Sequence, residues 1–240
     1  MKAIILAGGE GTRLRPLTYE IPKALIPVQG KTLTEQVFDI YKNVKVTEII
    51  LSISYLADKM VAYFEDGNKF GFDISYLRED RPRGTAGPLL LLKEKNEIPS
   101  QDFFMSNGDN LFALDLKKMI EFHKNQKAVV TIALVEAPDP TQVGVVKMSG
   151  DKILEFVEKP TREKAPSSFA NSGYYIISPE IFNYLPNQEF VMLEKDVFPV
   201  LAKAGKLFGF IGSGQWFDTG TPERYLQVQK EWRGPIKIEK

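Results

Sequence analysis

The chain is 240 residues long and carries 31 Lys and Arg residues against 31 Asp and Glu residues, so its formal net charge is zero. Without a clustered positive field, a nucleic-acid partner is not expected. The absence of cysteine excludes disulfides, thiol nucleophiles and cysteine-based zinc sites, and a single histidine excludes sites that need two. A hydrophobic content of 43% is ample for a buried core.

The apolar stretches of the sequence indicate a cytoplasmic protein without a membrane partner. The stretch near the start, residues 3–7, is too short for a signal peptide or a membrane span. The one histidine, His123, follows a segment with the pattern of an amphipathic helix. We expect its side chain to lie on the solvent-exposed face of that helix.

The first half of the chain alternates between strand-like and helix-like segments. Apolar runs at residues 2–7 and 48–54 predict buried strands, and Thr34 is a candidate N-cap for the helix between them. Residues 56–64 and 85–92 have helical patterns, whereas residues 72–77 and 103–105 have strand patterns. This alternation predicts an α/β fold with a Rossmann-like, mostly parallel sheet flanked by helices.

The second half is expected to be richer in strands. Strand patterns occur at residues 129–135, 144–147, 153–157 and 169–177, and two shorter ones flank residues 212–215. Helical patterns occur at residues 179–184 and 193–204. A last helix is expected to begin after Thr221, whose hydroxyl can cap it while Pro222 fits the first turn.

A glycine-rich loop follows the first expected strand. Residues 8–11 contain three glycines, which let backbone N–H groups approach a phosphate, and Arg13 and Arg15 follow. Leu14 breaks the dinucleotide-binding pattern and Leu25 breaks the Walker pattern. The two arginines favour a more anionic ligand such as a triphosphate. The alternative is a glycine-rich turn that leads to surface arginines.

One lysine stands in an otherwise apolar stretch just after this loop. Lys23 lies between Pro22 and Pro27, which stiffen the backbone around it. An ammonium group among apolar neighbours favours binding to an anion over free solvation. We therefore predict that Lys23 binds an anion.

Nine short motifs carry a resemblance to one family. They are LAGGEGTRLRPLT, PKALIPV, GTAGPL, NGD, GVV, FVEKP, ANSGYYIISPEIF, EKDVFP and WFDTGTPERYL, in chain order. Together they resemble the sugar-1-phosphate nucleotidyltransferases, or NDP-sugar pyrophosphorylases, and most of all the mannose-1-phosphate guanylyltransferases. Ala24 departs from the family, which more often has a second proline there.

The resemblance implies in-line attack of a sugar-1-phosphate oxygen on the α-phosphorus of an NTP, with Mg²⁺ as cofactor and pyrophosphate as product. The nucleophile is already ionised, so catalysis reduces to positioning and charge stabilisation and needs no general base. The chain would be a single nucleotidyltransferase domain over residues 1–240. Its nucleotide-binding part would cover about residues 1–127 and its sugar-binding part about residues 128–240.

The resemblance also implies roles for individual residues. Arg13 and Lys23 would be catalytic, and Asp109 and Asp218 would hold Mg²⁺, although each aspartate can equally be a turn residue. Glu158 and Lys159 can equally be a charged pair at a strand end, and Trp216 a core residue. The implied nucleotide-binding residues are Leu6, Ala7, Gly8, Gly9, Gly11, Thr12, Glu79, Gly84, Thr85 and Asp109, and the implied sugar-phosphate-binding residues are Gly144, Glu158, Lys159, Asn171, Gly173 and Trp216.

The choice of base is expected to depend on Glu79. Relatives that use thymine or uracil commonly present glutamine at this position. A carboxylate only accepts hydrogen bonds and therefore suits the N1–H and N2–H₂ donors of guanine. This predicts GTP as substrate, whereas the alternative is that Glu79 is a solvated charge among residues 78–81.

Other functions remain open at this point. Within the family, the rivals are a uridylyl- or thymidylyltransferase acting on glucose-1-phosphate and a guanylyltransferase acting on a heptose phosphate. A non-catalytic regulatory relative is a further alternative, and a glycosyltransferase would be expected to have an Asp-x-Asp motif, which Asn110 and Leu111 do not complete. No hexapeptide repeat follows residues 216–226, so we expect no second activity. A homo-oligomer and feedback regulation are left open.

Overall fold

The computed structural model describes residues 1–236. The chain forms two compact units, each built from separate segments. Unit 1 contains Met1–Arg81, Met105–Leu116 and the chain from Gly214 onward, and unit 2 contains Pro82–Phe104 and Lys117–Ser213. The expected division into nucleotide and sugar parts near residue 127 stays a prediction, and the two units do not follow that boundary.

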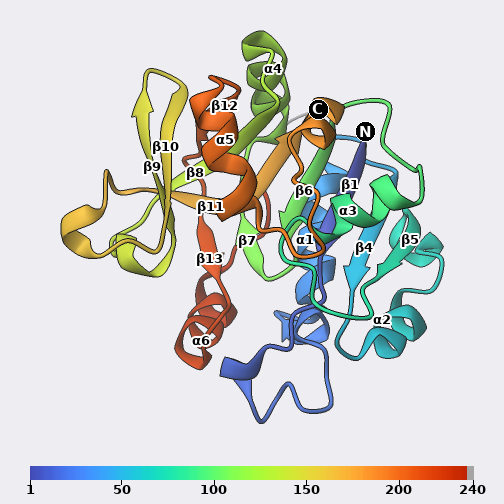
Figure 1. The fold of residues 1–240 in the computed structure, drawn as a ribbon. Coiled ribbons are helices and arrows are strands. Elements are labelled where there is room, and N and C mark those ends of the chain that lie inside the picture. The colour runs from blue at the N-terminus through green and yellow to red at the C-terminus, as the bar shows by residue number, and fades with distance from the viewer. Residues whose placement is uncertain (237–240) are drawn as a thin grey trace. The chain divides into compact units, whose positions relative to one another are not determined.

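In unit 1 the sheet strands lie in the order β5-β4-β1-β6 (Figure 1), and β1, β4 and β5 pair in parallel. Its central strands are apolar because both faces are covered, and Ala3, Ile4 and Ile5 of β1 have no exposed surface. The strands are β1 (Lys2–Leu6), β4 (Glu48–Ile53), β5 (Asp73–Arg78) and β6 (Phe103–Asn107), whose first residues belong to unit 2. The parallel register of β1, β4 and β5 brings the carboxyl ends of these strands to one edge.

Two small antiparallel pairs and three α-helices complete unit 1. Strand β13 pairs with β7, and α6 is the next element after β13 (Figure 1). The pairs are β2 (Pro27–Val28) with β3 (Lys31–Thr32) and β7 (Asn110–Phe112) with β13 (Trp216–Asp218). The helices are α1 (Leu33–Lys42), α2 (Ala57–Phe64) and α6 (Pro222–Glu231), with 3₁₀ turns at Thr12–Leu14, Lys23–Leu25 and Asn68–Phe70.

The helix starts of unit 1 test two predicted caps. Thr221 caps α6 with Pro222 in the first turn, which confirms that prediction. Thr34 is not the cap of α1, and this prediction was wrong. Thr32 is the cap, because its hydroxyl accepts a hydrogen bond from Glu35 N while the Glu35 carboxylate accepts one from Thr32 N at 2.6 Å. This reciprocal pair satisfies two backbone donors at once, which Thr34 could not do.

Unit 2 has a mixed sheet with strand order β11-β8-β12-β10-β9. Only β12 and β8 pair in parallel, whereas β8 with β11 and β9 with β10 are antiparallel. The strands are β8 (Val130–Glu136), β9 (Gly144–Ser149), β10 (Lys152–Glu158), β11 (Phe169–Ile177) and β12 (Leu207–Ile211). The helices are α3 (Gly87–Glu94), α4 (Leu116–Gln126) and α5 (Phe198–Lys203), with 3₁₀ turns at Pro140–Gln142, Arg162–Lys164 and Pro179–Asn183 and a π-helical turn at Leu193–Val197.

These elements confirm the predicted α/β class and the β-rich second half. The sheet arrangement is mixed, because β8 with β11 and β9 with β10 in unit 2 pair antiparallel, as do the two small pairs of unit 1. Within residues 1–236, none of the helices has both the length and the apolar character needed to span a membrane.

The prediction for His123 was wrong. Its side chain is buried, with 2% of the residue exposed, and its Nδ1 lies 2.8 Å from the Thr131 hydroxyl of β8. The Asp102 carboxylate lies 3.8 Å from Nε2. Burial lowers the pKa of His123, and the charge of Asp102 raises it in opposition. His123 therefore lies on the buried face of α4 with Leu116 and Met119, and its ring has a polar partner inside the fold.

Candidate active site

The glycine loop of unit 1 packs tightly against the segment that carries Lys23. Gly11 has a φ of +63°, and a Cβ on it would lie 2.9 Å from the Thr18 methyl group and 3.1 Å from Lys23 Cβ. The Thr18 hydroxyl donates a 2.8 Å hydrogen bond to the Gly11 carbonyl. Both the backbone angle and the close contact require glycine here. The loop after β1 and the lysine segment therefore form one compact structure.

Lys23 pairs with a residue that was singled out independently, Asp109. Its Nζ donates to Asp109 Oδ2 at 2.6 Å. The Lys23 side chain is only 9% exposed, whereas the Asp109 side chain is 38% exposed. Within the chain, Lys23 is thus paired with a carboxylate 86 positions away, and its binding of a substrate anion stays a prediction.

Asp109 and Asp218 lie on adjacent segments of unit 1. In the β7–β13 pair, Asp218 stands opposite Asn110, the residue after Asp109. The backbone N–H and the hydroxyl of Thr219 both donate to the Asp109 carbonyl, at 3.2 and 2.7 Å. Two aspartates that are far apart in sequence are therefore tied together through their backbones.

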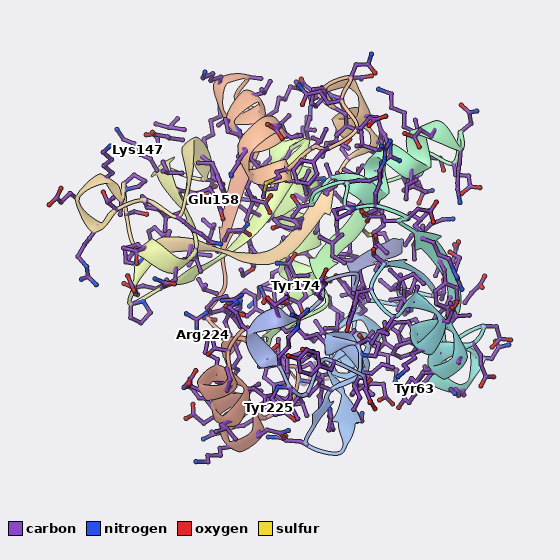
Figure 2. All side chains as sticks on the ribbon, turned by 60° about the horizontal axis from the view of Figure 1, so that its bottom comes forward. Tyr63, Lys147, Glu158, Tyr174, Arg224 and Tyr225 are labelled. Carbon is purple, nitrogen blue, oxygen red and sulfur yellow. The ribbon has the colours of Figure 1, made fainter. Side chains whose placement is uncertain are left out.

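The side chain of Asp218 is surrounded by donors. Its Oδ1 accepts a 2.7 Å hydrogen bond from Gly220 N, and its Oδ2 forms an ion pair with Arg224. A Cβ on Gly220 would lie 2.8 Å from both Asp218 Oδ1 and Arg13 Nη2, so these two side chains both approach the backbone at this glycine. Figure 2 shows Arg224 and its neighbour Tyr225 at the start of α6. Arg224 lies in the motif WFDTGTPERYL, but the sequence alone indicated no role for it.

The two aspartates are suited to Mg²⁺ rather than to a metal held by protein alone. Within residues 1–236, no cluster of three or more His, Cys, Asp or Glu side chains is arranged to hold a metal ion. Mg²⁺ prefers hard oxygen ligands and usually takes one or two carboxylates together with phosphate oxygens and water. Asp109 and Asp218 supply such a pair, and each already accepts a cationic side chain at its Oδ2.

Glu79 lies at the same edge of the sheet as the glycine loop. It follows β5 directly, and its N–H donates to the Ile53 carbonyl at the end of β4. The Ser52 hydroxyl donates to Glu79 Oε1 at 2.7 Å, and Ser52 itself is 2% exposed. Glu79 is therefore an oriented carboxylate rather than a freely solvated charge. Ser52 was missed because a serine inside an apolar strand carries no motif.

Two of the expected nucleotide-binding residues, Gly84 and Thr85, lie in unit 2. The Thr85 hydroxyl donates to Glu194 Oε2 at 2.5 Å and accepts from Leu193 N at 2.8 Å. Burial raises the pKa of Glu194, while the hydrogen bond from Thr85 opposes this effect. Glu194 stands in the π-helical turn, a feature that often marks functional sites. Glu194 is the first residue of the motif EKDVFP, but the sequence alone indicated no role for it.

Three of the expected sugar-phosphate residues of unit 2 lie at the β9–β10 pair. Gly144 stands opposite Glu158, and a Cβ on Gly144 would lie 2.5 Å from the Phe156 ring and 2.7 Å from Glu158 Oε2. Lys159 has a φ of +47° and its Nζ lies 3.8 Å from Glu158 Oε1. A left-handed backbone in a lysine is unusual and marks a constrained position. Figure 2 shows Glu158 at this pair.

The remaining sugar-phosphate candidates are divided between the two units. In β11, Asn171 Oδ1 accepts from Gly173 N and its Nδ2 donates to the Tyr175 hydroxyl, both at 2.9 Å. The strand register shifts between Asn171 and Tyr175, and Gly173 has a φ of +82°. This is the geometry of a bulge. Trp216, by contrast, is half-buried in β13 of unit 1.

Comparison with known proteins gives consistent matches over almost the whole chain. Residues 2–233 match the family model described as Nucleotidyl transferase. The mannose-1-phosphate guanyltransferase beta-B of Xenopus laevis is 37% identical over 94% of this chain and 63% of its own length. The UTP–glucose-1-phosphate uridylyltransferase of a Synechocystis strain is 35% identical over 95% of this chain and 62% of its own length.

A solved structure of HddC from Yersinia pseudotuberculosis complexed with GMP-PN gives a TM-score of 0.79 at 28% identity, covering 97% of this chain and 99% of that one. The chain thus spans less than two thirds of the curated relatives it matches and nearly all of this solved structure. With 232 consecutive positions matched by one model, from residue 2 to residue 233, the chain belongs to the Nucleotidyl transferase family.

Proposed function

We propose that the protein transfers a nucleotidyl group from an NTP to a sugar-1-phosphate and releases pyrophosphate. The observation that carries this proposal is the charged cluster of unit 1. There, Lys23 is paired with Asp109, and Asp218 is tied to the same backbone beside the glycine loop. The carboxyl ends of parallel strands are where α/β sheets bind their ligands.

The residues of unit 1 act on the triphosphate. Backbone N–H groups of residues 8–12 face its phosphates, and Arg13 neutralises the charge of the departing pyrophosphate. Lys23 stabilises the charge that develops on the α-phosphate, and it is held in place by Asp109. Asp109 and Asp218 would hold Mg²⁺, which when bound neutralises phosphate charge and orients the reacting groups. No side chain has to remove a proton, because the attacking phosphate oxygen is already ionised.

The residues of unit 2 act on the sugar phosphate. Glu158 accepts hydrogen bonds from sugar hydroxyls, Asn171 hydrogen-bonds them through its amide group, and Lys159 pairs with the phosphate. Gly144 and Gly173 let the sugar approach the backbone, since neither has a side chain to cover it. Thr85 orients the buried carboxylate of Glu194 within the same unit. Trp216 of unit 1 is proposed as an apolar wall for the sugar.

GTP is the nucleotide that Glu79 favours. Its carboxylate can accept from both N1–H and N2–H₂ of guanine, and the hydrogen bond from Ser52 limits its rotation. Mannose-1-phosphate is the proposed sugar, supported by the names of similar proteins and by the resemblance of the motifs. Uridylyl transfer to glucose-1-phosphate is the main alternative, because a relative with that name is almost equally similar.

The activity is tested with a matrix of purified NTPs and sugar-1-phosphates in the presence of Mg²⁺, scored by pyrophosphate release. We expect the highest rate with GTP and mannose-1-phosphate. Lys23→Met should lower kcat about 10²- to 10³-fold, the usual loss when one stabilising charge is removed from a transition state. No release from any pair by the folded protein would favour a non-catalytic relative, and a higher rate with UTP and glucose-1-phosphate would favour the alternative.

The base preference is tested with Glu79→Gln. We expect kcat/KM for GTP to fall about 10- to 100-fold, since a hydrogen bond to a charged group contributes about 1.5–3 kcal/mol. The ratio of UTP and dTTP to GTP should rise. Asp80→Asn is the matched control, because it removes the neighbouring exposed charge. An unchanged preference in Glu79→Gln would contradict the proposed role of this carboxylate.

A further inference from the structure

The carboxylate of Asp218 forms an ion pair with Arg224, a residue to which the proposed transfer gives no role. Arg224 Nη1 donates to Asp218 Oδ2. The Asp218 side chain is 19% exposed and the Arg224 side chain 36% exposed, so the pair is partly shielded from water. Attraction between opposite charges is stronger there than at a fully solvated surface. Arg224 is therefore a firmly held counter-ion of this carboxylate.

The start of α6 fixes the position of this arginine. Thr221 caps the helix by accepting a hydrogen bond from Arg224 N, and Pro222 occupies the first turn. The third residue of the helix is thereby directed back to Asp218. A guanidinium group stays charged at all working pH values. Arg224 therefore stays a cation beside Asp218 and does not vacate the carboxylate by losing a proton.

The pair affects how a divalent cation binds. Asp109 is likewise paired, with Lys23, and Arg13 lies close to Asp218 through Gly220. Three cationic side chains thus accompany the two carboxylates. Such a group repels an isolated divalent cation, whereas it attracts one that arrives with the negative charge of a triphosphate.

We propose that Arg224 is a built-in competitor for the metal at Asp218, which makes divalent-cation binding depend on the nucleotide. The inference rests on the proposed function, in which Asp218 is a metal ligand. Arg224 acts through Asp218 and is therefore a positioning residue. Its effect is to keep the nucleotide-free protein from loading a metal ion alone.

The test is a titration of the nucleotide-free full chain with Mn²⁺, followed by electron paramagnetic resonance. We expect Arg224→Gln to bind Mn²⁺ at least tenfold more tightly than the unmodified chain, which corresponds to about 1.4 kcal/mol. Lys230→Gln is the matched control, because Lys230 is an exposed cation in the last turn of the same helix. Its Mn²⁺ affinity should equal that of the unmodified chain.

The direction in which Arg224→Gln changes the Mn²⁺ affinity distinguishes competition for the metal from a purely structural role of Arg224. If Arg224 only held Asp218 in place, Arg224→Gln would weaken Mn²⁺ binding, and equal or weaker binding would overturn the proposal. The double variant Asp218→Asn/Arg224→Gln should lose the gain, and its persistence would mean that the ion is not at Asp218. If Arg224→Gln does not fold, Arg224→Lys replaces it, with a gain expected because an ammonium lacks the planar fork. No gain in that variant also overturns the proposal.

The outcome of this titration can be told apart from that of the activity test, since no substrate is present. An inactive chain in which Arg224→Gln tightens Mn²⁺ binding would refute the proposed transfer and leave this inference standing. An active chain in which the variant binds Mn²⁺ unchanged would refute this inference alone.

Discussion

The ion pair between Lys23 and Asp109 should be strongly asymmetric in its effect on stability. The two side chains are unequally exposed, at 9% for Lys23 and 38% for Asp109. Removing one partner leaves the other charge unpaired, and the cost depends on how well water can reach it. We therefore predict that Asp109→Asn destabilises unit 1 more than Lys23→Met does.

The magnitudes follow from these exposures. Breaking a fully buried pair costs about 3–5 kcal/mol, and the nearly buried Lys23 ammonium approaches this case. Since an asparagine oxygen can still accept a hydrogen bond, we expect about 3 kcal/mol for Asp109→Asn. The Asp109 carboxylate is more than a third exposed, so solvent screening reduces the cost of Lys23→Met to about 1 kcal/mol.

The assay is equilibrium unfolding in urea, followed by tryptophan fluorescence. The chain has two tryptophans, Trp216 and Trp232, and both belong to unit 1. The signal therefore reports the unit that contains the ion pair. The double variant should be more stable than Asp109→Asn alone, because the stranded ammonium is removed as well. A larger cost for Lys23→Met, or two costs that simply add, would refute the reasoning.

Three further predictions concern the rest of the fold. Burial lowers the pKa of His123 in the folded chain, so the unfolded chain binds a proton at a higher pH than the folded chain does. The free energy of unfolding is therefore retained above about pH 6.5 and falls as the pH drops through that value towards the folded pKa. His123→Gln should flatten this loss in urea midpoints measured from about pH 7.5 to 5.5, and an unchanged slope would contradict it. Thr32→Ala should cost about 1 kcal/mol by removing the cap shared with Glu35, whereas Thr32→Ser should cost little in the same assay. Gly144→Ala should cost about 1–3 kcal/mol, since its Cβ would lie 2.5 Å from the Phe156 ring. Thermal melting by circular dichroism measures this, and an unshifted midpoint would rule out the clash.

The elements that could be predicted from sequence were those with local causes. The start of α6 follows from Thr221 and Pro222 alone, and β11 coincides with the strand pattern at residues 169–177. The start of α1 also had a local cause, the pair of Thr32 and Glu35, but a second threonine two residues later competed for it. The burial of His123 had no local cause, because it depends on which face of α4 turns towards β8.

In the candidate site, individual residues could be selected from the sequence, but the pairs that they form could not. Lys23 was selected on local grounds, as a lysine in an apolar stretch between two prolines, whereas Asp109 was selected from the family resemblance. Their pairing could not be predicted, because it joins positions 86 residues apart and depends on the order of strands in the sheet. The grouping of Trp216 with unit 1 has the same origin, since it follows from the pairing of β13 with β7.

The pairing of Arg224 with Asp218 differs from these long-range pairings, because the two residues are only six positions apart. Three local features determine the pairing. The Asp218 carboxylate accepts from Gly220 N and turns the chain, Thr221 caps the helix, and Pro222 sets its first turn. Each feature was recognisable in the sequence, yet none of them alone places a side chain beside another. Taken together they direct the third helical residue back to the aspartate, so the identity of that residue decides whether the carboxylate meets a cation or water. Charge partners near a helix start can therefore be predicted when turn, cap and first-turn proline are considered as one unit.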